Sequence, residues 1–303
     1  MVVAGERLHD GEVQADEALV RRLLDEQHPD LAHLPVRRIA STGTDHAVFR
    51  LGDALVVRMP RIGWAEQHVE REATWLPIIG RDLPVETSRP VAIGEPGLGY
   101  PFRWLVSRWL PGTDLLAALT EDDGDGIDQV AVARDLAASL RALRAIDPDD
   151  GPEPGKRGRR LRVHDAWVRS CIDDLADEID AARAFELWDA ALAAEPWPEP
   201  KVWLHGDLLP GNVVVRDGRV AGVIDWASTG VGDPACDLVI AWSLSPEARA
   251  VFRDAVDLDD DTWARARGWA IEQAVPFIPY YESTLPEAVA ITRKRLAAAL
   301  AED

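Results

Sequence analysis

A short polar segment in the second half of the chain combines residue types that could carry out chemistry together. Asp207 precedes Asn212 by five positions, and a Pro-Gly pair at positions 210 and 211 forces a turn between them. One loop can therefore present a carboxylate and an amide toward the same point. Asp225 follows at the end of the apolar strand Val220–Ile224, where a carboxylate would otherwise be poorly placed. Separate roles as turn formers and a helix cap would explain each residue singly, but not their order and spacing.

These residue types suit the transfer of a phosphoryl group to a hydroxyl. Mg²⁺ prefers hard oxygen ligands, and proteins usually hold it with one or two carboxylates together with the phosphates of a substrate. Another carboxylate must orient the hydroxyl and accept its proton. Kinases provide the magnesium ligands and the proton-accepting carboxylate with a loop of the form Asp-x-x-x-x-Asn, which a metal-binding Asp follows along the chain. The segment Asp207–Asp225 has this order, so it predicts a kinase-type magnesium site.

A kinase also needs a cation for the phosphates of the nucleotide and an acid that holds this cation in place. Arg58 stands near the end of a strand-like run, and Glu72 lies on the helix predicted next, where the two could pair. An arginine can bind phosphate through two N–H groups, whereas a lysine acts as a point charge. On these two residues alone, a surface salt bridge is an equal alternative.

A turn upstream of Arg58 offers a second way to hold phosphates. The turn Ser41–Asp45 could lay backbone N–H groups against phosphate oxygens, as short glycine-containing turns do. It lacks a full glycine-rich signature. We nevertheless predict Ser41, Gly43 and Thr44 as nucleotide-binding residues.

Hydrophobic patterning predicts a small sheet in the first third of the chain. Asp16 can cap a helix whose apolar residues repeat on one face, and short strands divided by turns follow. The predicted strands are 36–40, 46–51, 54–59, 90–93 and 102–107, and the predicted helix among them is 64–79.

After position 112 the pattern changes to helical repeats rich in Ala and Leu. Two β runs interrupt them, at 213–216 and 220–224, and the Asp-Gly pair between these runs is a strong hairpin signal. The predicted helices are 128–146, 163–178, 181–194, 234–243, 246–256, 261–275 and 286–301. The sequence thus predicts an α+β protein with a β-rich lobe at 1–107 and a mostly helical lobe at 108–303.

The segment "VWLHGDLLPGNVVVRDGRVAGVIDWASTGVGDPACDL" resembles the catalytic segment of the aminoglycoside phosphotransferase family, kinase-like enzymes that phosphorylate antibiotics and related small molecules. The segments "TGTDHAVFRLGDALVVRMPR", "VEREATWLP" and "SRWLPGTDL" fall in the family's order, so the resemblance spans about residues 36 to 300. It implies a two-lobed, protein-kinase-like fold. The N-terminal lobe would bind the nucleotide, and the C-terminal lobe would carry the catalytic loop and the acceptor site.

The resemblance also implies a role for each polar residue of the predicted site. Asp207 corresponds to the catalytic base, and Asn212 and Asp225 correspond to the magnesium ligands. Arg58 and Glu72 correspond to the pair that positions the phosphates.

The nucleotide implied by the resemblance is ATP or GTP. The inter-lobe stretch from Ser107 to Leu110 would meet the adenine through backbone groups of Arg108 and Leu110. Asp237 corresponds to a position that braces the catalytic loop. Arg58 departs from the lysine that usually occupies its place, which leaves the cation geometry and the choice of nucleotide open.

The composition argues against several classes of partner. A formal net charge of −20 would repel nucleic acid, while an acidic surface could either attract a cationic acceptor or simply favour solubility. The one basic run, 156–160, is predicted to be a solvated connector. No stretch has the length and apolarity of a membrane span or of a signal peptide, and two cysteines suit a reducing compartment. We therefore expect a cytoplasmic protein with no membrane partner.

The expected acceptor is a hydroxyl of a small molecule, with an aminoglycoside-like antibiotic favoured. A macrolide, an amino alcohol and a sugar metabolite are alternatives within the same class. A protein kinase is disfavoured because no Ala-Pro-Glu element follows Asp225. The alternative outside the enzymes is a nucleotide-binding pseudokinase that regulates a partner, which the loss of Asp207, Asn212 or Asp225 would have indicated. The sequence makes no prediction of the oligomeric state.

Overall fold

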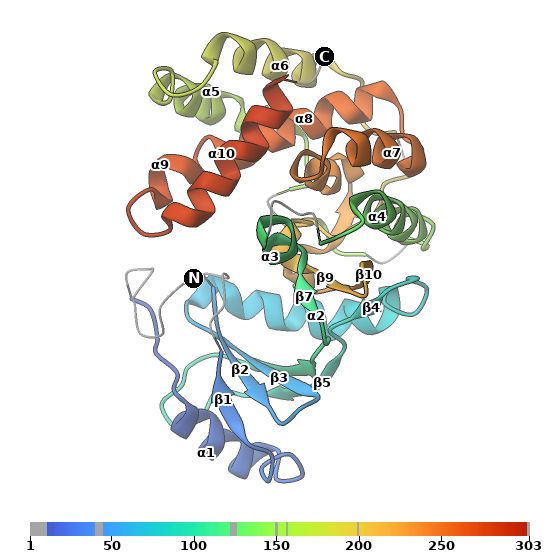
Figure 1. The fold of residues 1–303 in the computed structure, drawn as a ribbon. Helices are drawn as coiled ribbons and strands as arrows, with labels where there is room; N and C mark the ends of the chain where they lie inside the picture. Colours follow the sequence, from blue (N-terminus) through green and yellow to red (C-terminus); the bar gives the residue numbers. More distant parts are fainter. Residues whose placement is uncertain are drawn as a thin grey trace. The chain divides into compact units, whose positions relative to one another are not determined.

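The computed structural model divides the chain into two compact units (Figure 1). The first contains Met1–Arg81, Val85–Gly112 and Ala221–Ala227, and the second contains Asp82–Pro84, Thr113–Val220 and Ser228–Asp303. The structure describes residues 11–39, 45–121, 126–148, 151–155, 157–198 and 200–301. No helix of these described ranges is long and apolar enough to cross a membrane.

The first unit is built on a five-stranded sheet in which all neighbouring strands are antiparallel. The strand order in space is β1-β2-β3-β6-β5. These strands are β1 (Val36–Arg38), β2 (His46–Leu51), β3 (Leu55–Pro60), β5 (Pro90–Gly94) and β6 (Trp104–Arg108). Their bounds agree with the predicted strands to within about two residues at each end.

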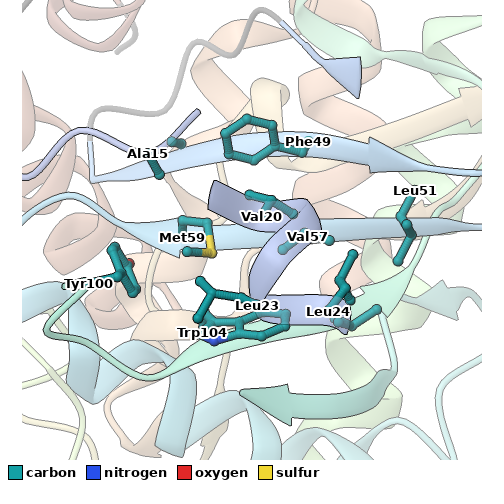
Figure 2. Close-up of a cluster of buried hydrophobic side chains, with 12 residues drawn as sticks. Ala15, Val20, Leu23, Leu24, Phe49, Leu51, Val57, Met59, Tyr100 and Trp104 are labelled. Carbon is teal, nitrogen blue, oxygen red and sulfur yellow. The ribbon is translucent and has the colours of Figure 1, made fainter. Parts of the chain in front are cut away.

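One face of this sheet is covered by helix α1 (Glu17–Gln27). The carboxylate of Asp16 caps the helix by accepting a hydrogen bond from Leu19 N at 2.7 Å, as the sequence predicted. Figure 2 shows the apolar cluster that α1 forms with the sheet. The cluster contains Ala15, Val20, Leu23, Leu24, Ala47, Phe49, Leu51, Val57, Met59, Tyr100, Trp104 and Val106.

The opposite face of the sheet faces helix α2 (Glu66–Ile79), which a 3₁₀ turn at Gly63–Ala65 precedes. Successive residues of a strand point to opposite faces. Val57 and Met59 lie in the apolar cluster, so Arg58 points to the other face, where it meets Glu72 of α2. The alternation of β3 therefore sends one charged side chain toward α2 while its neighbours build the core.

The second unit is mostly helical (Figure 1). Its helices are α3 (Leu115–Thr120), α4 (Gln129–Arg144), α5 (Asp165–Asp174), α6 (Ala181–Ala193), α7 (Pro246–Val256), α8 (Asp260–Ala274), α9 (Phe277–Tyr281) and α10 (Pro286–Ala301). Its 3₁₀ helices are Leu161–His164, Pro210–Asn212 and Pro234–Ser243. Helix α8 packs against the last of these, against α6 and against α10.

The second unit also contains short strands. Strand β7 (Thr113–Asp114) pairs antiparallel with β9 (Val213–Arg216), and β8 (Val202–Leu204) pairs antiparallel with β11 (Gly230–Gly232). Asp217 and Gly218 follow β9 with φ of 54° and 74°, the left-handed conformation that a two-residue hairpin turn requires.

Strand β10 (Arg219–Val223) carries the chain back into the first unit. There, Gly222 and Val223 pair in parallel with β4 (Glu86–Thr87). The residues that follow this strand, including Asp225, are thereby fixed within the first unit.

The α+β fold class expected from the sequence is confirmed. The helix predicted at 234–243 is instead a 3₁₀ helix in which Pro234 to Trp242 are all buried. Long 3₁₀ runs are uncommon, so packing on all sides, and not the backbone alone, holds this segment. The sequence did not predict α3 and α9, which have only six and five residues.

Candidate active site

The first unit holds a compact group of three charged side chains centred on Arg58. Its Nη1 donates to both carboxylate oxygens of Glu72, at 2.6 and 2.8 Å, and its Nη2 donates to Asp225 Oδ1 at 2.6 Å. The Glu72 side chain is 1% exposed, that of Arg58 13% and that of Asp225 36%. Arg58 is therefore held from the protein side by Glu72, while Asp225 retains access to solvent.

The backbone gives Asp225 its place at the end of β10. Its φ of 61° is left-handed, a conformation that aspartate tolerates better than most residues. The indole Nε1 of Trp226 donates to Val223 O at 3.0 Å across this turn. The chain thus bends sharply where the strand ends, and the bend directs the carboxylate to Arg58.

Charge pairing fixes the ionisation of this group. Burial alone would raise the pKa of Asp225, but the Arg58 guanidinium holds it far below its usual range. Burial alone would lower the pKa of Arg58, but Asp225 and Glu72 raise it above its usual value. The group therefore carries one positive and two negative charges at neutral pH.

Two histidines lie beside this group. The rings of His46 and His68 are 5.6 Å apart, and with Arg58 and Glu72 they line a small pocket. Burial lowers the pKa of His46 well below its usual value, and the positive charge of Arg58 lowers it further. Burial also lowers the pKa of His68, although the carboxylates of Asp225 and Asp45 oppose this. Both rings are therefore neutral at pH 7.

We expect the buried state of His46 to make stability depend on pH below neutrality. The unfolded chain takes up a proton on this histidine as the pH falls through about 6.5, and the folded chain does not. The free energy of unfolding should therefore fall from pH 7 to pH 5, by up to about 1.4 kcal/mol per pH unit for this one group. Urea unfolding across that range gives the slope of the unfolding free energy against pH. This slope should be shallower in His46→Gln than in wild type. It should be unchanged in His33→Gln, which alters an exposed histidine. Equal slopes in wild type and His46→Gln would contradict this account.

The second unit holds the predicted catalytic loop, which a buried carboxylate anchors. Asp237 Oδ2 accepts from His205 N at 2.6 Å, and its Oδ1 accepts from Gly206 N at 2.8 Å. Gly206 has a φ of 82°, and a Cβ there would lie 2.5 Å from Ser228 O. Only glycine fits this approach. Asp237 thus contacts the loop as expected, and it does so through backbone N–H groups.

Hydrogen bonds within the loop orient Asp207 and Asn212. Asp207 N donates to His205 Nδ1 at 3.2 Å, and Asn212 Nδ2 donates to Asp207 O at 2.9 Å. The amide nitrogen of Asn212 is thereby used within the loop, which leaves its Oδ1 as the atom for a ligand. The Asp207 side chain forms an ion pair with Arg157.

Each unit offers oxygen atoms of the kind that Mg²⁺ accepts as ligands. In the second unit Asn212 offers an amide oxygen, and in the first unit Asp225 offers Oδ2 in addition to the Oδ1 that Arg58 occupies. Hard oxygen donors of this kind are those that Mg²⁺ uses with nucleotides. Within the described ranges, no three or more His, Cys, Asp or Glu side chains gather into a metal cage.

Comparison with known proteins assigns the family. Residues 36–269 match the model of the Phosphotransferase enzyme family. The chain belongs to this family. It is 30% identical over 175 residues to an aminoglycoside 3'-phosphotransferase of Streptomyces fradiae, a match that covers 56% of this chain and 59% of that protein. The chain therefore spans little more than half the length of this relative.

Two further matches cover more of the chain. The uncharacterized protein YcbJ of Bacillus subtilis is 42% identical over 240 residues, which are 71% of this chain and 72% of that protein. The GDP complex of wild-type aminoglycoside 2'-phosphotransferase-IIIa superposes with a TM-score of 0.70 at 16% identity, over 95% of this chain and 99% of that one. This likeness shows the two-lobed, kinase-like fold.

The stretch predicted to meet the base of the nucleotide lies at the end of β6. Ser107 is fully buried, and Arg108 N donates to Arg89 O at 2.9 Å. Among the described residues, none accepts from the backbone N–H of Leu110. Contact of the base with Leu110 stays a prediction, and the predicted phosphate turn at Ser41, Gly43 and Thr44 lies outside the described residues.

Three charged or titratable residues, two in the second unit and one in the first, were not predicted from the sequence. The solvated connector predicted at 156–160 is wrong for Arg157, whose side chain is only 27% exposed and pairs with Asp207. Arg295 of α10 and His46 of β2 were not singled out. No pattern in the neighbouring sequence marks either residue, because tertiary packing alone brings each to its partners.

Proposed function

We propose that the chain is a nucleoside-triphosphate-dependent phosphotransferase that phosphorylates a hydroxyl of a small molecule. The observation that carries the proposal is Arg58, held by Glu72 and facing Asp225. This arrangement provides a fixed cation for phosphate beside an ionised carboxylate for a metal ion. The donor would be ATP or GTP. The relatives' names make an aminoglycoside-like compound the first acceptor to test.

The residues of the chain have separate tasks in such a transfer. Arg58 would bind oxygens of the nucleotide phosphates, since Glu72 has already fixed its position. Asp225 and Asn212 would hold Mg²⁺, which, when bound, offsets the negative charge of those phosphates.

Asp207 would orient the acceptor hydroxyl and take up its proton. The hydroxyl oxygen bonds to the γ-phosphorus as the bond from that phosphorus to the nucleoside diphosphate breaks. The hydrogen bonds that Asp237 accepts from backbone N–H groups of the loop would keep the Asp207 carboxylate in place.

The metal assignment predicts a loss of activity in Asp225→Asn. Asparagine tolerates the left-handed backbone but carries no charge, so kcat/KM should fall by more than about 100-fold, beyond the usual effect of a residue that only supports a metal ligand. Initial rates with Mg²⁺ and ATP or GTP would be measured over a panel of aminoglycosides, macrolides and amino alcohols. Asp217→Asn, also at a positive φ but exposed, is the matched control. Full activity in EDTA, or an active Asp225→Asn variant, would refute the assignment.

A further inference from the structure

Two arginines of the second unit lie in the electrostatic surroundings of Asp207. Arg157 forms an ion pair with the Asp207 carboxylate, with side chains that are 27% and 31% exposed. The second is Arg295 of α10, and its charge interacts with both Arg157 and Asp207. Helix α10 packs against the 3₁₀ helix Pro234–Ser243, which carries the Asp237 that anchors the catalytic loop.

Arg295 is a buried arginine. It is only 7% exposed, and its Nε is buried without a hydrogen-bond partner. No carboxylate of the described residues forms an ion pair with it. Burial, and then the positive charge of Arg157, lower its pKa to about 10, while Asp207 acts in the opposite direction. Buried charges in proteins are normally paired or hydrogen-bonded, so an unpaired one needs an explanation.

The acidic groups around the two arginines are already engaged. Asp237 accepts hydrogen bonds from backbone N–H groups. Glu272 of α8 interacts with Arg157, and its carboxylate lies 3.7 Å from His164 Nδ1. The Asp207 carboxylate forms an ion pair with Arg157 and interacts electrostatically with Arg295, so one negative charge stands against two positive ones. An additional anion would therefore complete the pairing.

We propose that Arg157 and Arg295 form an oxyanion-binding subsite beside Asp207. This deepens the proposed phosphotransferase function and rests on it. The subsite would bind a phosphate or carboxylate group, for which guanidinium groups provide paired N–H donors. This group belongs either to the phosphorylated product, as its phosphoryl group, or to the acceptor, as an anionic substituent. Arg157 would turn from Asp207 to the anion, which frees the Asp207 carboxylate for the acceptor hydroxyl.

Inorganic sulfate is the probe for the subsite, because it carries the charge and shape of a phosphate group. Its binding to the full chain without nucleotide would be measured by titration calorimetry at constant ionic strength. We expect Arg295→Met and Arg157→Gln to raise the sulfate Kd by more than about tenfold. Arg293→Met is the matched control, because Arg293 lies on the same helix but pairs with Glu178 and Glu282. It should leave the Kd unchanged.

Thermal unfolding separates this role from a structural one. An unpaired buried charge destabilises the fold, so Arg295→Met should unfold at the same or a higher temperature than wild type without sulfate. Sulfate should stabilise wild type more than Arg295→Met. The proposal is overturned if wild type binds sulfate no better than Arg295→Met, including no binding at all. A lower unfolding temperature of Arg295→Met with unchanged sulfate affinity would also overturn it.

Competition against sulfate distinguishes the two sources. Displacement by glycerol 3-phosphate alone indicates the phosphoryl group of the product, and displacement by glycerate as well indicates an anionic group on the acceptor. Glycerol should not displace sulfate. If glycerol displaced sulfate as readily as glycerol 3-phosphate does, the result would count against the subsite. Because nucleotide is absent, the assay also separates the two proposals. Sulfate binding without phosphotransfer to any acceptor would reject only the enzymatic function, and turnover without sulfate binding would reject only the subsite.

Discussion

Replacing Asp207 by asparagine is expected to lower kcat by about 10²–10⁴-fold and to leave the affinity for Mg²⁺-nucleotide nearly unchanged. A positioned general base contributes on this scale, which corresponds to roughly 3–5 kcal/mol of the barrier. The substitution removes the charge and the proton-accepting oxygen but keeps the shape. The backbone N–H and carbonyl of this residue hold the loop together, and both survive the change.

Steady-state kinetics with the identified acceptor, together with nucleotide binding measured separately, would check this result. Asp207→Asn should lose kcat, whereas Asp225→Asn should also change the dependence of the rate on Mg²⁺ concentration. The two losses should not add in the double variant, because both residues serve one transition state. Near-normal turnover of Asp207→Asn would make the catalytic interpretation of the loop wrong. A nucleotide-binding regulator would then become the leading alternative.

Much of the fold could be predicted because its elements have strong local signals. The strand His46–Leu51 and the helices Pro246–Val256 and Pro286–Ala301 have the predicted bounds. Apolar alternation, a capping residue and helical periodicity all act within a few residues of chain. Helix α9 has five residues, too few for a periodic pattern, so its signal could not be separated from a loop.

Contacts within the candidate site could be predicted from local sequence where the partners are close along the chain. Asp207 and Asn212 share one turn, and Arg58 and Glu72 belong to successive elements. Arg58 and Asp225, in contrast, are 167 positions apart, and only the kinase-like order of motifs suggested that they work together.

No sequence motif indicated the ion pair of Arg157 with Asp207. A basic run beside Pro and Gly has the composition of a solvated connector, and nothing local distinguishes one of its arginines from the others. The ion pair and the burial of Arg295 arise from the packing of distant segments. Both are therefore findings of the structure.

Arg58→Met is expected to cost about 3–5 kcal/mol of folding stability at neutral pH and to abolish phosphotransfer. The change leaves two carboxylates without their cation, and one of them, Glu72, has a side chain that is only 1% exposed. Asp225 would lose the guanidinium that holds its pKa far below the usual range. A lowered folded-state pKa of a carboxylate stabilises the protein above the unfolded pKa, so the deficit of Arg58→Met should shrink as the pH falls below about 4. Urea unfolding at several pH values would measure it.

A second substitution tests whether the deficit comes from the unpaired carboxylate. Arg58→Met combined with Glu72→Met should recover most of the stability but none of the activity, because two apolar side chains of similar volume can replace a buried ion pair. Arg58→Lys should keep part of the stability and part of the activity. Lysine retains the positive charge, but it has no planar guanidinium group that donates to Glu72 and Asp225 at the same time. Arg103→Met is the control, as Arg103 pairs with an exposed glutamate, Glu95, on the same unit. If Arg58→Met were as stable and as active as Arg103→Met, Arg58 would be a surface ion pair and the nucleotide site would have to lie elsewhere.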